Sequence, residues 1–419
     1  MRTIHVSLSH RTTLAFLTLG LTLGVVVVAC AGNEDEGPQP DVDAGTSTIP
    51  VVDATSADTP DAADAGCSDG SANCGVPEPC KADWCPVFTI LDERVGLSAV
   101  WGSGPSDVWV VGAAGRVLHW DGSAWETLSA GTTQSLYAVW GSGPNDVWAV
   151  STPGAIFHST GFANGTAEWS RATDIADAGV DTASAGKLSR AIWGTSPRDV
   201  WVGGDPFARK GSTATWGGFR TVVADAGVDG GVADGGIVWT PVSSSLITAI
   251  WGSGPEDIWV VGPGAKGLAA GGSSAAHSNG AVGSDGVPVW TAFDTQSTDV
   301  LYAIWGSGPG DVWAVGDHGT IRHFTAGATR WSIVESPTTA KLRGVWGTGP
   351  SDVWAVGEEG TLLHYDGTKW SAATADFAPG EKPSLFGVWG SGPNDVWAVG
   401  SGTIFHYSGP KPVAEGADR

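Results

Sequence analysis

The hydrophobic and polar positions of this chain follow a pattern that returns seven times, in a form close to WGSGPNDVWAVG at Trp389–Gly400. In the copy that begins near Lys341, apolar residues alternate along LRGVWG and again along DVWAVG. A period of two predicts β-strands. Between them, Gly-Pro-x-Asp predicts a tight turn, because Pro fixes φ and Asp accepts backbone N–H bonds. Each copy therefore predicts a pair of antiparallel strands.

Each copy opens with a tryptophan and carries a second one eight residues later. The leading tryptophans are Trp101, Trp140, Trp193, Trp251, Trp305, Trp346 and Trp389. The second tryptophans are Trp109, Trp148, Trp201, Trp259, Trp313, Trp354 and Trp397. The residue after the proline changes from copy to copy and includes acidic, basic and glycine residues. This internal comparison predicts that it lies at an exposed turn tip, whereas the tryptophans are expected mostly in the core.

The remainder of each copy predicts two further strands, TLLHY and a strand that begins at Trp370 in the clearest copy. Four short strands that repeat every 39 to 58 residues are typical of a propeller blade. One such sheet is too small to be stable alone, but seven in a ring cover one another's faces. We predict an all-β protein, a seven-bladed β-propeller of four-stranded antiparallel blades over residues 86–408.

The last copy ends with its third strand, Thr403–Tyr407, and a strand-like segment, Pro86–Asp92 (PVFTILD), precedes the first copy. Pairing of these two segments would close the ring and hide both sheet edges. We therefore predict closure of the ring by this N-terminal strand, and a flexible tail over residues 409–419.

Composition and charge agree with this fold and narrow the function. The 23 Trp and 63 Gly suit many short strands with tight connections. A net charge of −23 argues against nucleic acid as a partner, because phosphate binding needs a basic surface.

The residues that suggest chemistry are themselves repeated. His119, His158, His323, His364 and His406 share one third-strand position, which His277 is expected to share, and an Asp precedes every second Trp. We interpret the aspartates as turn caps and the imidazoles as hydrogen-bonded to the turn or to a neighbouring blade. A repeated residue is a poor candidate for a single catalytic site, so we expect no enzyme activity, no metal and no cofactor.

The first 29 residues predict a signal peptide, with Arg2 and Arg11 before an apolar run that extends to Ala29. Val27-Val28-Ala29-Cys30 resembles the lipobox of bacterial lipoproteins, which implies cleavage before Cys30 and a lipid on its sulfur. Ala31, where an Asp would signal inner-membrane retention, favours the outer membrane, on its periplasmic or surface face. An uncleaved anchor or an ordinary signal peptide are the alternatives.

Residues 30–66 are acidic and rich in Pro, Ala and Thr without an aromatic residue, which predicts a disordered linker. Residues 67–85 then predict a small disulfide-rich collar. Its four cysteines imply two disulfides in an exported protein, with three connectivities open; they are Cys67, Cys74, Cys80 and Cys85.

Two turns, Asp121–Trp125 and Asp366–Trp370, resemble a degenerate Asp-box. Asp-box (BNR) repeats occur in sialidase-like and photosystem-assembly-factor-like propellers, where a similar Asp–Gly–Trp turn is structural. The resemblance implies the architecture. The arginine triad and Tyr/Glu pair that sialidases need are not matched, so the activity is not carried over.

The second, third and fourth copies are longer than the others, at 53, 58 and 54 residues. The third lacks the histidine, and basic residues gather around its insertion. They could bind an anion or an acidic glycan, or they could pair with neighbouring acids in two flexible insertions; the candidate ligand residues are Arg209, Lys210, Trp216 and Arg220. Calcium binding by those acids is a weaker alternative, because their spacing does not match an EF-hand loop.

The sequence as a whole favours a monomeric, envelope-anchored lipoprotein whose propeller is a non-catalytic binding or scaffolding module for a protein or glycan. Three alternatives remain open. They are a sialidase-like or lyase-like glycan-processing enzyme, a multivalent tectonin-like lectin that stacks sugars on exposed Trp, and a purely structural envelope protein.

Overall fold

The structure is a computed structural model that describes residues 80–87, 96–151, 155–172, 189–208, 215–223, 237–243, 245–263, 273–284, 286–380 and 382–410. The predicted signal peptide, Cys30, the linker, Cys67 and Cys74 and nearly all of the predicted tail lie outside these residues. In the described part, no helix has the length and apolar character needed to cross a membrane.

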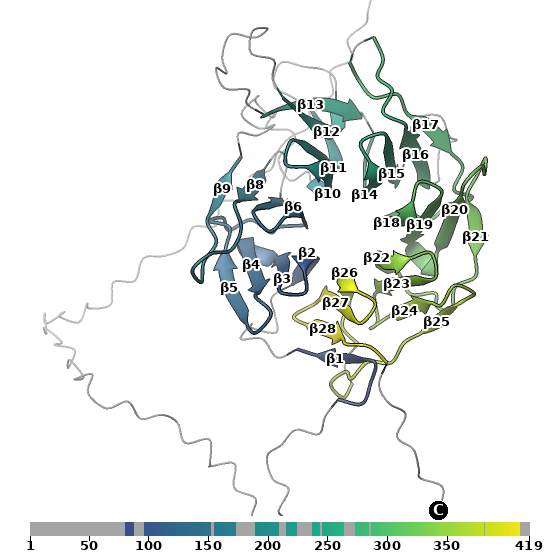
Figure 1. The fold of residues 1–419 in the computed structure, drawn as a ribbon. Helices are drawn as coiled ribbons and strands as arrows, with labels where there is room; N and C mark the ends of the chain where they lie inside the picture. Colours follow the sequence, from purple (N-terminus) through teal and green to yellow (C-terminus); the bar gives the residue numbers. More distant parts are fainter. Residues whose placement is uncertain are drawn as a thin grey trace, which may run out of the picture. The chain divides into compact units, whose positions relative to one another are not determined.

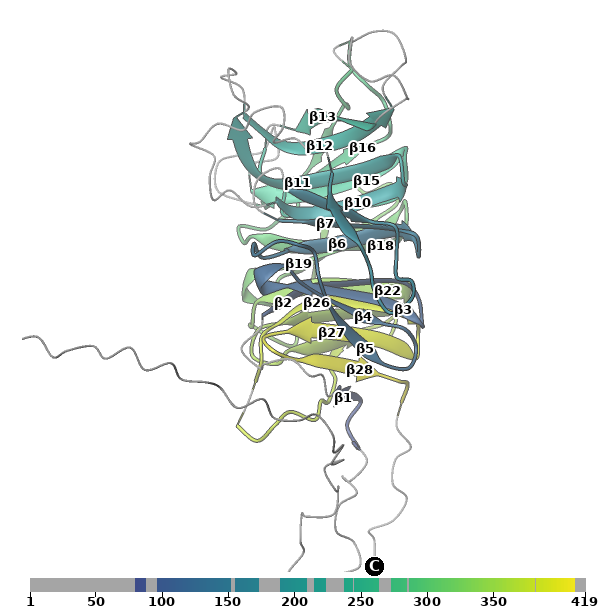
Figure 2. The same ribbon diagram turned by 90° about the vertical axis from the view of Figure 1, so that its left-hand side faces the viewer.

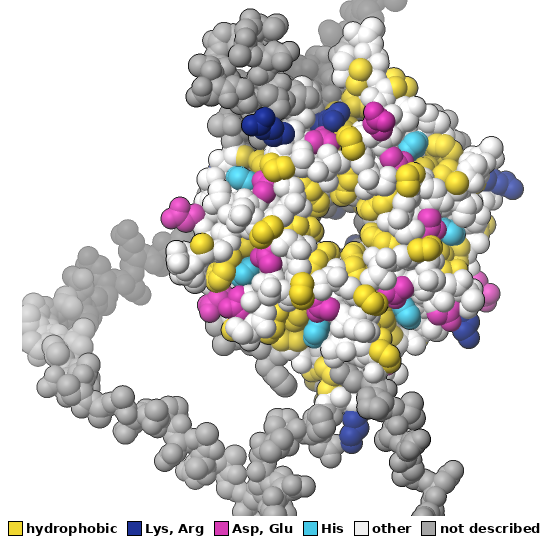
Figure 3. Space-filling model, viewed as in Figure 1, with side chains coloured by type: hydrophobic (Ala, Val, Ile, Leu, Met, Phe, Trp, Pro, Cys, Tyr) yellow, Lys and Arg dark blue, Asp and Glu magenta, His cyan; other side chains and the backbone are white. Residues whose placement is uncertain are grey.

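The described chain forms seven four-stranded antiparallel sheets, which are arranged in a ring (Figure 1) around a central channel that stays open between the side chains (Figure 3). In the view turned by 90°, the strands run across the picture in successive layers (Figure 2). The predicted seven-bladed β-propeller is therefore confirmed. Two short 3-10 turns, η1 (Ala113–Gly115) and η3 (Asp317–Gly319), follow second strands of their blades.

The strands occupy equivalent places in every blade. The innermost strands are β2 (Leu97–Gly104), β6 (Ala138–Gly143), β10 (Ser189–Ser196), β14 (Ala249–Gly254), β18 (Leu301–Gly308), β22 (Leu342–Gly349) and β26 (Leu385–Gly392). The second strands are β3 (Asp107–Gly112), β7 (Asp146–Val150), β11 (Asp199–Ala208), β15 (Asp257–Pro263), β19 (Asp311–Gly316), β23 (Asp352–Gly357) and β27 (Asp395–Gly400). The third strands are β4 (Arg116–Trp120), β8 (Ile156–Ser159), β12 (Thr215–Val223), β16 (Ser273–Ser278), β20 (Ile321–Thr325), β24 (Leu362–Tyr365) and β28 (Ile404–Tyr407). The outer strands are β5 (Trp125–Ser129), β9 (Trp169–Arg171), β13 (Ile237–Ser243), β17 (Thr291–Phe293), β21 (Ser332–Val334), β25 (Trp370–Ala372) and β1 (Trp84–Pro86).

The core lies between neighbouring blades and is built on pairs of tryptophans. All seven second tryptophans of the motif are at most 5% exposed, as their position in the alternating strand predicted. Each one meets, edge to face, a Trp that lies on or immediately before the outer strand of the next blade, with ring centroids 5.1–6.4 Å apart. The pairs are Trp109–Trp169, Trp148–Trp239, Trp201–Trp290, Trp259–Trp331, Trp313–Trp370, Trp354–Trp84 and Trp397–Trp125.

The leading tryptophans are half-buried, and each covers the motif glycine of the following blade. At Gly306, an added Cβ would come within 2.6 Å of both the Trp251 ring and the Asp311 carbonyl oxygen. The series of Trp–glycine contacts is complete around the ring, because Trp389 of the last blade lies over Gly102 of the first. The Trp-Gly pair of the motif is therefore explained by blade packing.

The ring is closed by an N-terminal strand, as predicted, but the strand lies earlier in the chain than Pro86–Asp92. Strand β1 begins at Trp84 and pairs with β28, so that Trp84 faces Tyr407. Only Pro86 is shared with the predicted strand, and residues 88–95 lie outside the described residues. The physical reason is Trp84 itself, which is fully buried and supplies the outer-strand Trp of the seventh blade.

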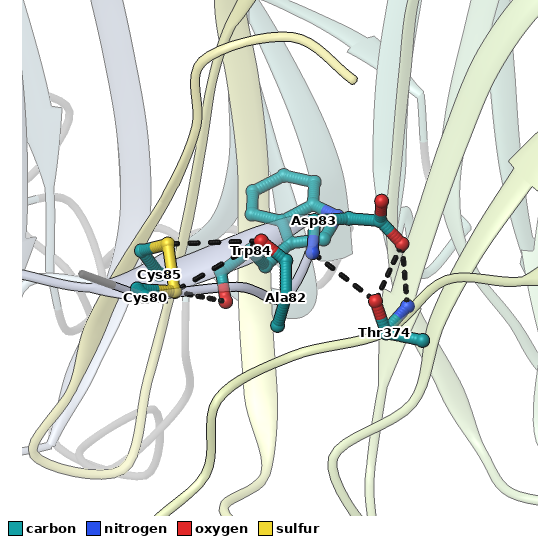
Figure 4. Close-up of a disulfide and its surroundings, with 6 residues drawn as sticks. All are labelled: Cys80, Ala82, Asp83, Trp84, Cys85 and Thr374. Carbon is teal, nitrogen blue, oxygen red and sulfur yellow. Dashed lines mark hydrogen bonds between the residues drawn. A yellow bond between two sulfur atoms is a disulfide. The ribbon is translucent and has the colours of Figure 1, made fainter. Parts of the chain in front are cut away.

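Strand β1 is also joined to the sixth blade and carries a disulfide (Figure 4). The Asp83 carboxylate accepts bonds from the Thr374 amide and hydroxyl at 3.0 and 2.6 Å, and the Trp84 amide donates to the Thr374 carbonyl at 3.0 Å. Cys80 and Cys85 are bonded to each other and enclose this segment. One disulfide of the predicted four-cysteine set is thus present, and the other two cysteines, Cys67 and Cys74, are outside the described residues.

Candidate functional site

The innermost strands run between two ends of the channel that differ in composition. We call the end with the Gly-Pro-x-Asp turns and the leading tryptophans the motif end. We call the other end, where the innermost strands begin, the variable end. Figure 3 shows one end of the channel, where hydrophobic side chains gather around the central opening and acidic and histidine side chains lie together farther out.

The motif aspartates hold the turns together. In the first blade, Asp107 accepts bonds from the Ser103 hydroxyl at 2.6 Å, the Trp109 indole at 2.9 Å and His119 Nε2 at 2.7 Å. Burial raises the pKa of Asp107, but the hydrogen bonds from His119 and Ser103 outweigh it and keep this pKa below its usual value. The carboxylate is therefore ionised at neutral pH, and the imidazole is the donor.

The same imidazole–carboxylate contact recurs in six blades at 2.5–2.8 Å, between His119, His158, His277, His323, His364, His406 and their motif aspartates. The prediction that these residues bond the turn is confirmed. Among the described residues, no group of His, Cys, Asp or Glu is arranged to hold a metal ion.

In the third blade, Arg220 takes the place of the missing histidine. It pairs with Trp201 across the sheet, donates from Nε to Asp199 Oδ1 at 2.7 Å and lies 4.8 Å above the Trp201 ring. Arg220 is therefore ion-paired, but with the motif aspartate; the acids of the two insertions, which the sequence suggested as partners, lie outside the described residues. Trp216 lies on β12, and Arg209 and Lys210 are outside the described residues, so a ligand role for them stays a prediction.

The glycosidase hypothesis requires two converging unpaired carboxylates near this segment. The two described aspartates of β11 both have cationic partners, since Asp199 bonds Arg220 and Asp205 bonds Arg190. The required pair is therefore absent from the part of this blade that the structure describes.

The two Asp–Gly turns are structural, as the Asp-box resemblance implied. Asp121 Oδ1 accepts bonds from the amides of Ala124 and Ser123 at 2.8 and 2.7 Å. These bonds lower the pKa of Asp121 to about 2, with the Ala124 amide as the largest cause. Asp366 makes the equivalent turn, and its pKa is also lowered to about 2, chiefly by the Thr368 hydroxyl.

A hollow of about 300 Å³ opens at the variable end and is lined by one residue from each blade. Each of these residues lies three positions before a leading Trp, at or next to the start of an innermost strand. The lining residues are Ser98, Tyr137, Arg190, Thr248, Tyr302, Arg343 and Phe386. Whereas the leading position is always Trp, this position holds five different residue types.

Carboxylates on the adjoining segments fix the two arginines of the hollow. Arg190 Nε and Nη2 donate to the two oxygens of Asp205 at 3.0 and 3.3 Å. Arg343 Nη2 donates to Glu358 at 2.6 Å. Because the paired guanidinium groups are held in place, they are pre-organised for contact with a ligand.

The fifth and sixth blades add a connected polar group beside Arg343. The Tyr302 hydroxyl donates to Asp317 at 3.1 Å, and the Lys341 ammonium lies 2.9 Å from the other oxygen of that carboxylate. The bond to Asp317 raises the pKa of Lys341. The Arg343 guanidinium lies 4.6 Å above the Tyr302 ring, within cation–π distance.

None of the residues that line the hollow was among the site residues predicted from the sequence. The seven copies vary at the turn tip, where variation reflects exposure, and also at the position three residues before each leading Trp. Variation there, among residues that alternate with core positions, was the available signal.

No protein-family model matches this chain, and no curated protein is significantly similar to it in sequence. Solved structures with the same fold include "YCF48 bound to D1 peptide" (TM-score 0.54, 16% identity, 78% of this chain and 97% of that chain). YCF48 from Cyanidioschyzon merolae (0.53, 15%, 77% and 98%) and a streptogramin B lyase (0.53, 15%, 78% and 96%) are also similar. At these identities the likeness shows the fold alone. The chain is a seven-bladed β-propeller protein.

Proposed function

We propose that the propeller is a non-catalytic binding module that holds a segment of a partner protein at the variable end of the channel. The observation that carries the proposal is the hollow of about 300 Å³, to which every blade contributes one residue from the same position. The remainder of the motif is repeated because it builds blades. A position that varies while its neighbours repeat is free to be selected for recognition.

The residue types support this proposal. Tyr and Arg, which dominate the energetic centres of protein interfaces, supply four of the seven lining positions. YCF48, which has the same fold, is known in a structure bound to D1 peptide, and this supports a peptide as a ligand class.

We also propose that the module is displayed from the cell envelope through a lipid on Cys30, with the linker as a spacer. Metabolic labelling with a radioactive fatty acid should mark the wild-type chain but not Cys30→Ser. Equal labelling of both chains, or of neither, contradicts the lipid anchor without affecting the binding proposal.

Site-specific photo-crosslinking tests the binding proposal. A benzophenone amino acid at Ser98, in the hollow, should capture a defined partner protein in cells, and Tyr302→Ala should reduce that capture. The same probe at Glu126, exposed on outer strand β5, is the matched control. Equal capture from both positions contradicts the proposal. Turnover of a glycan by the full chain, lost when a lining residue is changed, would replace it with the enzyme alternative.

A further inference from the structure

The variable end has two unlike halves. Blades follow one another around the ring in chain order (Figure 1). Phe386, Ser98 and Tyr137 come from three consecutive blades, the seventh, first and second, and form an uncharged arc with two aromatic rings. Arg190 and Arg343 come from the third and sixth blades and bound the opposite arc.

The charged half presents cations to the hollow. Asp205 and Glu358 bond the two arginines but do not line the hollow themselves, and among its described lining residues there is no carboxylate. Each guanidinium has more N–H donors than these contacts use. A ligand carboxylate can therefore accept bonds from arginines that are already held in position.

Long-range electrostatic attraction does not explain the binding of a ligand carboxylate by these arginines. Each arginine is balanced by its own carboxylate, and the chain carries a net charge of −23. The preference of the hollow for an anionic group must come from short, directional, charge-assisted hydrogen bonds. The uncharged arc offers the complementary contact, since Phe386 and Tyr137 can pack against an apolar side chain.

We propose that the variable end binds an acidic peptide segment, with a carboxylate on Arg190 or Arg343 and an apolar side chain against Phe386 and Tyr137. This inference rests on the proposed function, because it names the ligand of the same site. It makes the two halves separable, since each should control a different feature of the bound peptide.

Selection from a library of displayed random octapeptides, with the full chain as bait, tests the inference. Peptides bound by the wild-type chain should be enriched both in Asp or Glu and in aromatic or aliphatic residues. In Arg190→Gln/Arg343→Gln, glutamine can still bond the carboxylate behind it, but the acidic enrichment should fall by about tenfold. Phe386→Ser should weaken the apolar preference and leave the acidic one. Arg330→Gln, at an exposed position before outer strand β21, is the matched control and should select as the wild type does.

The outcomes separate the two proposals. If Phe386→Ser changes the selection but acidic residues are neither enriched nor affected by the double arginine change, the acidic ligand is wrong and the binding site stands. If the wild-type chain enriches no peptide, or if all lining variants select the same peptides, the proposed function itself fails.

Discussion

The two ends of the channel are made by the same seven innermost strands, yet they have opposite character. At the motif end, every blade supplies the same Trp, and each covers a glycine of the next blade. Three residues earlier in each copy, at the variable end, Ser, Thr, Tyr, Arg and Phe replace one another. The difference shows that blade packing constrains only one of the two positions. The following changes test that division, beginning with the largest expected effect.

Removing a buried motif tryptophan should cost the most stability. Trp313 is 1% exposed and packs edge to face on Trp370, so Trp313→Ala should lower the free energy of unfolding by about 3–5 kcal/mol. Ser98→Ala, at the variable end, should change it by no more than about 0.5 kcal/mol. Urea denaturation of both variants measures the contrast, and equal losses would show that the two ends are not constrained differently.

The motif glycines provide a narrower test on a single strand. Gly306→Ala places a methyl group against Trp251 and the Asp311 carbonyl and should cost about 1–3 kcal/mol. Gly308→Ala, two residues later on β18, meets nothing within 4 Å and is the matched control. A comparable loss at both positions in urea denaturation would mean that strand conformation, and not the covering Trp, requires the glycine.

Both ends depend on closure of the ring, which the Cys80–Cys85 disulfide supports. A loop of this length is expected to contribute about 2 kcal/mol by restricting the unfolded chain. Cys80→Ser/Cys85→Ser should therefore melt at a lower temperature than the oxidised wild type in calorimetry. Peptide selection by the variant at low temperature should be unchanged, because the disulfide contacts no lining residue. An unchanged melt would show that the other contacts of β1 suffice.

The smallest effect is a pH dependence that belongs to the motif end alone. Burial raises the pKa of Asp352, but hydrogen bonds from His364 and Thr348 outweigh it and hold the folded pKa below the model-peptide value. Its ionised form thus contributes stability above about pH 4, and that contribution is lost as pH falls through the folded pKa. Asp352→Asn should be less stable than the wild type at pH 6, and the gap should narrow below pH 4. A gap that is constant with pH would contradict this linkage.

The repeated part of the fold could be predicted because seven copies constrain one another. Alternation located the first two strands, and Asp366–Gly367 located a turn that the structure confirms. The closing strand was misplaced because PVFTILD resembles a strand by itself, whereas the register is decided by burial of Trp84 against Trp354. That contact joins residues far apart in sequence. The available signal was that the seventh copy lacks a Trp for its outer strand, which Trp84 supplies.

The candidate site was less accessible to sequence reasoning. The irregular third copy was predicted to hold the ligand site. In the structure, its Arg220 bonds Asp199 in the same way as the histidines of the other blades bond their aspartates. The lining residues come from seven separate blades and have no spacing that marks a known site. Their convergence is a property of the closed ring, which brings together positions that lie 39 to 58 residues apart in the chain.

The contact of each leading Trp with the next blade's glycine has one further consequence. All seven junctions run head to tail in the same direction, and Trp389 on Gly102 makes the last of them like the others. No blade is therefore structurally the first. The first and last described strands, β1 and β28, pair with each other in the seventh blade. A circular permutant, opened between two other blades and joined by a short linker from Tyr407 to Trp84, would keep every junction and both ends of the channel.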